Sequence, residues 1–262
     1  MEYAVVSIAA LVVSALALYS GFGLGTLLMP VFAIFFPVSV AVACTAVVHL
    51  ANNLFRVGIV GRRADWRIVL LFGLPAIAFA LLGAFLLVRI SDVAALASYH
   101  IGSAEFTITT VKLVVAGLII FFAMFELVPA LGKIEFPRKY IPLGGALSGF
   151  FGGLSGHQGA LRSAVLSKVG LETAVFIGTV SICAFMVDVS RLAVYGVSFF
   201  AEDFSKATDG KGLALIGTAT LAAFVGTYAS SRLLKKVTMK TIRLVVGVML
   251  MVLGIVLAVG LV

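Results

Sequence analysis

The chain has 262 residues, of which 62% are hydrophobic and only 11% are charged. A soluble domain needs about a quarter of charged residues to cover its surface, so this composition excludes a protein surrounded by water and indicates an integral membrane protein. The net charge of +8 does not indicate nucleic-acid binding, because the basic residues fall mostly in short loops between apolar runs and accompany no aromatic-and-basic motif.

The apolar runs predict an all-α membrane protein with about ten hydrophobic helices. A spanning helix needs about 20 apolar residues, and six runs reach that length: 38–60, 68–89, 109–131, 172–199, 212–234 and 240–261. The chain starts Met1-Glu2-Tyr3 without a basic region or a small-residue cleavage site, so we expect the first apolar segment to be retained rather than removed as a signal peptide.

Four shorter apolar runs form two pairs, 3–19 with 22–36 and 141–154 with 158–170, and a glycine-rich bend joins the members of each pair. We expect each pair to form a helical hairpin that dips into the membrane and turns back. Irregular backbone at that depth is tolerated only where it is buried in protein or lines a watery cavity. Two such broken segments at corresponding places of two halves are typical of a transporter's central site.

The charges of the loops predict the orientation. Lys and Arg gather in 61–67, 132–140 and 232–243 and at Lys168, which together hold twelve of the nineteen basic residues, whereas acidic residues accompany the four basic residues at the opposite side. Basic loops stay in the cytoplasm. We therefore place both termini on the outer side of the membrane.

This orientation gives two halves of opposite topology, and we predict a first inverted repeat at 1–131, a cytoplasmic linker at 132–140 and a second inverted repeat at 141–262. Identities at a nearly constant spacing of 133–135 residues support the pairing: Gly23 with Gly156, Thr45 with Thr179, Arg56 with Arg191 and Gly61 with Gly196.

The two bends predict an anion site. The helices that start after them have free N–H groups and the positive end of the helix dipole, and glycine allows a ligand to approach the backbone closely. Glycines could instead serve close helix packing. The candidate binding residues are Ser20, Gly21, Gly23, Gly25, Thr26, Ser155, Gly156, His157, Gln158, Gly159, Arg162 and Ser163.

Arg162 is the charged residue of this set. An arginine within the membrane must face the protein interior and have a partner, and either a substrate anion or Asp188 fits. His157 could bind an anion or act as a polar cap at the helix end.

Further polar residues of the apolar segments are expected to line the space between the halves, or to tie helices together: Asn52, Asn53, Arg56, Asp188 and Arg191. Asp188 and Arg191 are three residues apart and can pair within one helix. We interpret His49 as a core residue, Glu126 as solvated near a loop, and Cys44 and Cys183 as small buried side chains.

The two bends, the segment Leu27-Leu28-Met29-Pro30 after the first one, and Thr45 and Thr179 in the following helices resemble the sulfite exporter TauE/SafE family over essentially the whole chain. The resemblance implies a permease of a bacterial inner membrane for sulfite, sulfoacetate or other organosulfonates, with no cofactor or metal. Its partners would be the anion and the lipid bilayer, with a homo-oligomer possible. The second bend has His157 and Gln158 where the family usually has glycine.

Two alternatives remain open at this point. An anion channel of the same architecture has the same sequence pattern. An intramembrane serine hydrolase is suggested by Gly153-Leu154-Ser155-Gly156, with a histidine as base.

Overall fold

The structure is a computed structural model that describes residues 2–20, 24–128, 131, 137–198, 211–233 and 239–261. The first part of the chain forms α1 (Glu2–Ser20), α2 (Leu24–Ala33), α3 (Val38–Val60), the 3-10 turn η1 (Gly61–Arg63), α4 (Trp66–Ser91) and α5 (Thr110–Leu127). The second part forms η3 (Arg138–Tyr140), α6 (Ile141–Ser155), α7 (Gln158–Leu166), η4 (Ser167–Val169), α8 (Thr173–Ser198), α10 (Lys211–Leu233) and α11 (Met239–Ala258).

Five helical stretches among the described residues are long and apolar enough to cross a membrane: Val38–Arg63, Trp66–Ser91, Thr110–Leu127, Thr173–Val197 and Gly212–Ser230. The helix bounds agree with the predicted apolar runs to within a few residues. Local signals set several of the starts. The Asp65 carboxylate accepts hydrogen bonds from the backbone N–H groups of Arg67 and Ile68 at 2.9 and 3.1 Å, which caps α4.

A β-hairpin lies where only a loop was predicted, and it is an exception to the all-α class. Strands β1 (Ala97–Ile101) and β2 (Ala104–Ile108) pair antiparallel, with Ile101 opposite Ala104. The two-residue turn places Gly102 at φ 64°, which suits glycine. The rings of Tyr99 and Phe106 stack across the strands at 5.6 Å. Polar and apolar side chains alternate in 98–101 and 104–108, as in half-exposed strands, and the charge of the segment alone does not reveal that period.

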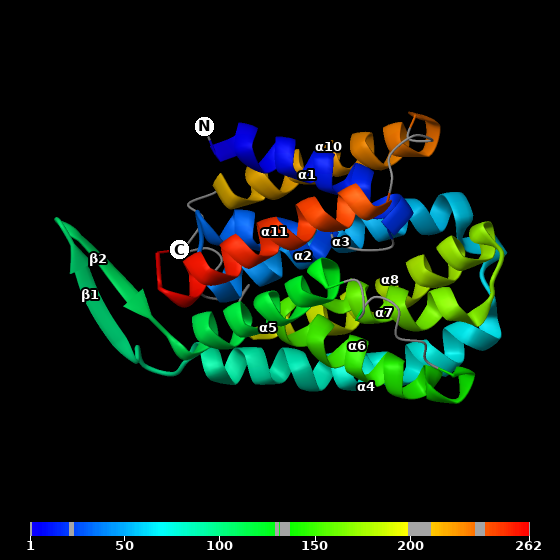
Figure 1. Cartoon of the computed structure of the whole chain (residues 1–262), viewed down its shortest axis with the longest axis horizontal. Helices are drawn as coiled ribbons and strands as arrows, with labels where there is room; N and C mark the ends of the chain where they lie inside the picture. The colour runs from blue at the N-terminus through cyan, green and yellow to red at the C-terminus, as the bar shows by residue number, and fades with distance from the viewer. Residues whose placement is uncertain are drawn as a thin grey trace.

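The helices pack in pairs that join the two parts of the chain (Figure 1). α1 lies along α10, α4 lies along α6, α5 lies along α11, and α3 crosses α8 in the middle. The α4–α6 pair is especially close. Gly145, Gly149 and Gly153 of α6 rest on the backbone carbonyls of three α4 residues spaced by one turn: Phe72, Ala76 and Ala80. Small residues allow such close packing, which takes the place of the hydrophobic driving force that membranes lack.

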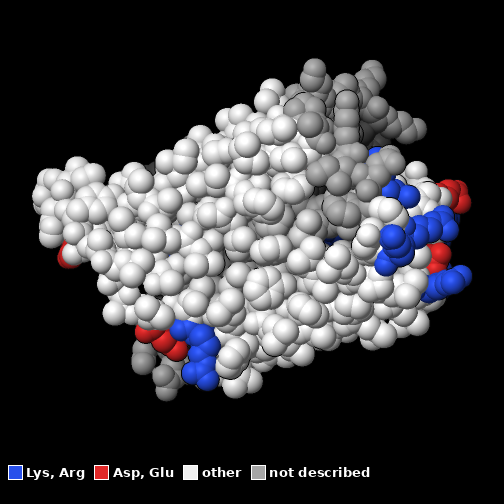
Figure 2. Space-filling model, turned by 60° about the horizontal axis from the view of Figure 1, so that its bottom comes forward, with Lys and Arg blue, Asp and Glu red and all other residues white. Residues whose placement is uncertain are grey.

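The two ends of the molecule differ in their charge. Both termini and the β-hairpin lie at one end, and the α3–α4 and α7–α8 connections lie at the other (Figure 1). Figure 2 shows a large group of basic side chains, with acidic ones among them, at one end, a smaller basic and acidic group at the other, and a largely uncharged surface between the two. Five basic residues of the α3–α4, η3 and η4 connections are exposed, and so is Arg89 at the opposite end of α4: Arg62, Arg63, Arg138, Lys139 and Lys168. An uncharged belt between polar ends is what a lipid bilayer requires.

We expect Gly149→Val to destabilise the fold strongly, because the added side chain meets the Ala76 carbonyl of α4. Overpacking typically costs about 1–3 kcal/mol and more against rigid backbone. Gly117→Val in α5 is the matched control, since no atom lies within 4 Å of the added Cβ there. Thermal unfolding of the purified protein in detergent measures both, and equal melting temperatures would contradict the α4–α6 contact.

Candidate functional site

The two glycine-rich bends touch each other although they lie far apart in the chain. The second bend ends α6 at Ser155, and Gly156 then adopts φ 83°, a left-handed conformation that favours glycine. A Cβ added to Gly25, in the first turn of α2, would lie only 3.0 Å from the Gly156 carbonyl oxygen. Gly21 and Gly23, with the side chains of Ser20 and Thr26, lie outside the described residues. The starts of α2 and α7 are thereby brought side by side.

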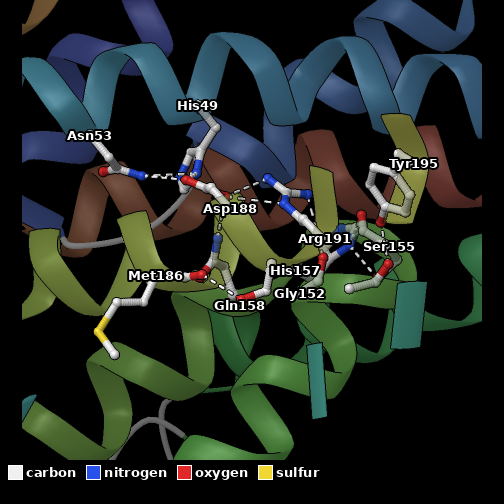
Figure 3. Close-up of polar contacts among 12 residues, drawn as sticks. His49, Asn53, Gly152, Ser155, His157, Gln158, Met186, Asp188, Arg191 and Tyr195 are labelled. Atoms are coloured by element: carbon white, nitrogen blue, oxygen red, sulfur yellow. Dashed lines mark hydrogen bonds and ion pairs between the residues drawn. The ribbon is translucent and has the colours of Figure 1, made fainter. Parts of the chain in front are cut away.

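The Asp188 carboxylate of α8 is the centre of a buried polar cluster beside this contact (Figure 3). One oxygen accepts hydrogen bonds from His49 Nδ1 at 2.7 Å and Asn53 Nδ2 at 2.8 Å. The other accepts from Gln158 Nε2 at 2.8 Å and from Arg191 Nε and Nη2 at 3.1 and 2.8 Å. Five nitrogens from α3, α7 and α8 therefore converge on one carboxylate, and Asp188 joins three helices.

The pair of Asp188 and Arg191 forms within α8, as their spacing predicted. Arg191 also donates from Nη1 to the Gly152 carbonyl of α6 at 3.4 Å. The Tyr195 hydroxyl, one turn further along α8, donates to the Gly153 carbonyl. These contacts fasten α8 to the end of α6 directly before the second bend.

Arg162 is almost fully buried at 2% exposure and points into the protein. Its Nη1 donates to Gln158 Oε1 at 2.7 Å. No salt bridge joins Arg162 to Asp188 in the described residues, since Arg191 and His49 lie nearest that carboxylate. The neutral Gln158 amide thus lies between the Arg162 guanidinium and the Asp188 carboxylate.

One face of α3 carries the polar residues of the first part of the chain. His49 and Asn53, one turn apart, both reach Asp188. Asn52 points elsewhere: its Oδ1 accepts from the Thr227 hydroxyl of α10 at 2.8 Å and ties these two helices. The interpretation of His49 as an ordinary core residue missed its 2.7 Å contact with Asp188. Its position four residues before Asn53, on the same helix face, was the available signal.

Several buried polar atoms of this region have no hydrogen-bond partner in the described part of the chain. They belong to the guanidinium groups, one hydroxyl and one imidazole: Arg56 Nε and Nη2, Arg162 Nε, Thr45 Oγ1 and His157 Nε2. Buried polar atoms are almost always satisfied in native proteins. Two of these atoms, Arg162 Nε and His157 Nε2, belong to the second bend and the helix that follows it.

His157 and Ser155 contact each other within the second bend. His157 Nδ1 lies 3.0 Å from the Ser155 carbonyl and 2.9 Å from its hydroxyl, and the imidazole stacks on Phe122 with centroids 5.5 Å apart. The Ser155 hydroxyl itself donates to the Phe151 carbonyl at 3.1 Å. Because a carbonyl oxygen only accepts, we assign the proton to His157 Nδ1, which donates. A histidine base that activates a serine must instead accept the proton of the serine hydroxyl.

The other candidates lie around this cluster. Gly159 is buried in the first turn of α7, and Ser163, one turn on, is half-buried. Glu126 lies near the end of α5, and the Lys112 ammonium donates to the carbonyls of Thr107 and Gly260 at the hairpin end. Cys44 and Cys183 are buried, free thiols, as expected. No group of three possible metal ligands occurs among the residues the structure describes.

Comparison with known proteins assigns the family. The family model described as "Sulfite exporter TauE/SafE" matches residues 6–257, nearly the whole chain. The chain belongs to this family. No curated protein and no solved structure matches it. A TauE/SafE member with several membrane-spanning helices is a multi-pass membrane protein of a transporter family rather than an enzyme, and a small anion is the kind of substrate the family indicates.

We expect Asp188→Asn to destabilise the protein by about 3–5 kcal/mol, the usual cost of removing one partner from a buried ion pair. The amide keeps the shape but leaves Arg191 without its counter-charge. The double variant Asp188→Asn, Arg191→Gln removes both charges and should regain a large part of this loss.

Ser190→Ala serves as the control, because the Ser190 hydroxyl donates only to the Met186 carbonyl of its own helix. Thermal unfolding in detergent measures all three variants. A wild-type melting temperature for Asp188→Asn would show that the carboxylate does not hold the helices together.

Proposed function

We propose that the protein exports small sulfur-containing anions, such as sulfite, sulfoacetate or other organosulfonates, from a site between the two bends. The observation that carries this proposal is the buried guanidinium of Arg162, which lies on the helix that starts at the contact of the two bends and has no carboxylate bonded to it. A buried cation beside two helix starts favours an anion as ligand.

The anion would be bound by groups that the fold already brings together. The first N–H groups of α2 and α7 have no partner within their helices, and the helix dipoles add positive potential there. Arg162 supplies a full positive charge and Gln158 an amide. His157, with its proton on Nδ1, presents a lone pair at Nε2, so it would donate to the anion only after gaining a second proton.

The pairing of helices supports two inverted repeats, 1–131 and 141–262, joined by the linker 132–140. In the two halves, α1 corresponds to α6, α3 to α8, α4 to α10 and α5 to α11. The α1–α10 contact is therefore equivalent to the α6–α4 contact, and the α3–α8 and α5–α11 contacts each join a helix to its own counterpart. Two equivalent halves can open a shared site to each side in turn, as in other inverted-repeat transporters.

Alternating access would require the junction at Asp188 to rearrange. His49 and Asn53 come from the first half, and Gln158 and Arg191 come from the second. Gln158 accepts from Arg162 and donates to Asp188, so an anion that binds near Arg162 competes for both contacts. Loss of the Gln158 donor would change the environment of Asp188, the group through which His49 and Asn53 of the first half are bonded to the second half.

The distribution of charge supports a place in a bacterial inner membrane. Basic connections stay in the cytoplasm, which would put the α3–α4 connection inside and both termini on the periplasmic side. A membrane potential that is negative inside then favours export of an anion, by about 2.3 kcal/mol per charge for each 100 mV.

We expect proteoliposomes that contain the purified protein to transport radiolabelled sulfite, and Arg162→Gln to slow this transport about ten- to hundredfold. A hydrogen bond to a charged group is worth about 1.5–3 kcal/mol, which corresponds to that range. Arg67→Gln is the control, because Arg67 is also an arginine but is exposed at the start of α4.

The proposal fails if sulfite, sulfoacetate and simple sulfonates neither cross the membrane nor bind to the wild-type protein. It also fails if Arg162→Gln and Arg67→Gln transport equally well. Currents of large unitary conductance in planar bilayers would assign the same site to a channel instead.

A further inference from the structure

Two arginines beside the Asp188 cluster are buried without a carboxylate bonded to them in the described part of the chain. Arg56 of α3 is 6% exposed and Arg162 of α7 is 2% exposed. Arg162 donates to Gln158, which donates to Asp188, and Arg56 lies three residues after Asn53, which donates to the same carboxylate. Neither forms a salt bridge in the described part of the chain. Nε and Nη2 of Arg56 and Nε of Arg162 are left without any hydrogen-bond partner.

The carboxylate that could balance them is already engaged. Among the described side chains, three arginines and one acid are buried: Arg56, Arg162, Arg191 and Asp188. Asp188 binds Arg191 through two nitrogens and fills its remaining acceptor positions with His49, Asn53 and Gln158. One buried arginine is therefore neutralised, and two positive charges remain in excess in a medium where uncompensated charge is costly.

A difference between the two halves explains this excess. Asn53 and Asp188 lie 135 residues apart and bond to each other, and Arg56 and Arg191 lie at the same spacing. Arg191 thus has an acid three residues before it, whereas the equivalent Arg56 has the neutral Asn53. The sequence keeps both arginines but provides only one with its local counter-charge.

We propose that Arg56 and Arg162, one from each half, together bind a doubly charged oxyanion, and that Arg56 makes the site prefer dianions to monoanions with the same sulfonate group. This inference rests on the proposed function and narrows its substrate class. It includes sulfite in its dianionic form and sulfonates that carry a second acid group, and it disfavours simple alkanesulfonates. Arg56 is the residue that determines this preference.

Ligand pairs that differ in charge but hardly in shape test this directly. Sulfoacetate is a dianion, and its amide, sulfoacetamide, has nearly the same size with one charge; sulfate and methanesulfonate form a second pair. Binding to the purified full-length protein is measured by calorimetry, and by the rise in melting temperature, at one ionic strength and at a pH where all acid groups are ionised. We expect each dianion to bind at least about tenfold more tightly than its partner.

Substitutions at Arg56 then test the assignment of that preference. Arg56→Gln should bring the two members of each pair to within about threefold, mainly by weakening the dianion, while Arg56→Lys should keep the preference because it keeps the charge. Size-exclusion profiles check that the variants are folded. If Arg56→Gln does not fold, the comparison in the wild type and in Arg56→Lys still decides.

The possible results separate this inference from the proposed function. Equal binding of dianions and monoanions by the wild type overturns the dianion preference but leaves an anion transporter. A preference that persists in Arg56→Gln overturns the role of Arg56. If no anion of either charge binds to the wild type, both the inference and the proposed function are wrong.

Discussion

A single buried carboxylate holds the centre of this protein together. Asp188 is fully buried and accepts hydrogen bonds from His49, Asn53, Gln158 and Arg191, which come from three helices. In a low-dielectric interior a carboxylate is tolerated only when nearly all its acceptor positions are filled. The positions of α3, α7 and α8 relative to one another are therefore set by the need to satisfy this one group.

Close helix packing makes that arrangement possible. The glycines of α6 allow it to lie directly on the backbone of α4, and Gly226 of α10 meets the Leu11 carbonyl of α1 in the corresponding pair. Lipid tails are as apolar as the side chains that face them, so contact area and small residues drive association instead. These outer pairs brace the central crossing of α3 and α8, and they leave the broken helices to meet inside the bundle (Figure 1).

Electrostatics links this architecture to its proposed use. The fold buries more positive than negative charge among the described side chains. The excess lies on Arg162, in the helix that starts at the contact of the two bends, and on Arg56, three residues after Asn53 in α3. A transporter must bind its substrate well enough to select it and must still release it. Positive charge on the protein that is balanced only while an anion is bound attracts that anion. It also makes the preferred conformation of the protein depend on whether the anion is bound.

The sequence by itself determined the membrane class, the helix bounds, the two bends and the family, because each depends on local composition or on a regular spacing along the chain. It also identified Arg162 as buried and Asp188 with Arg191 as a local pair. Only the tertiary structure decided that His49 and Asn53 reach Asp188 and that Gln158 lies between Arg162 and that carboxylate. It also decided that no described carboxylate pairs with Arg56. Hydrogen bonds between residues 135 or 139 apart depend on how the helices cross, and no local pattern carries that information.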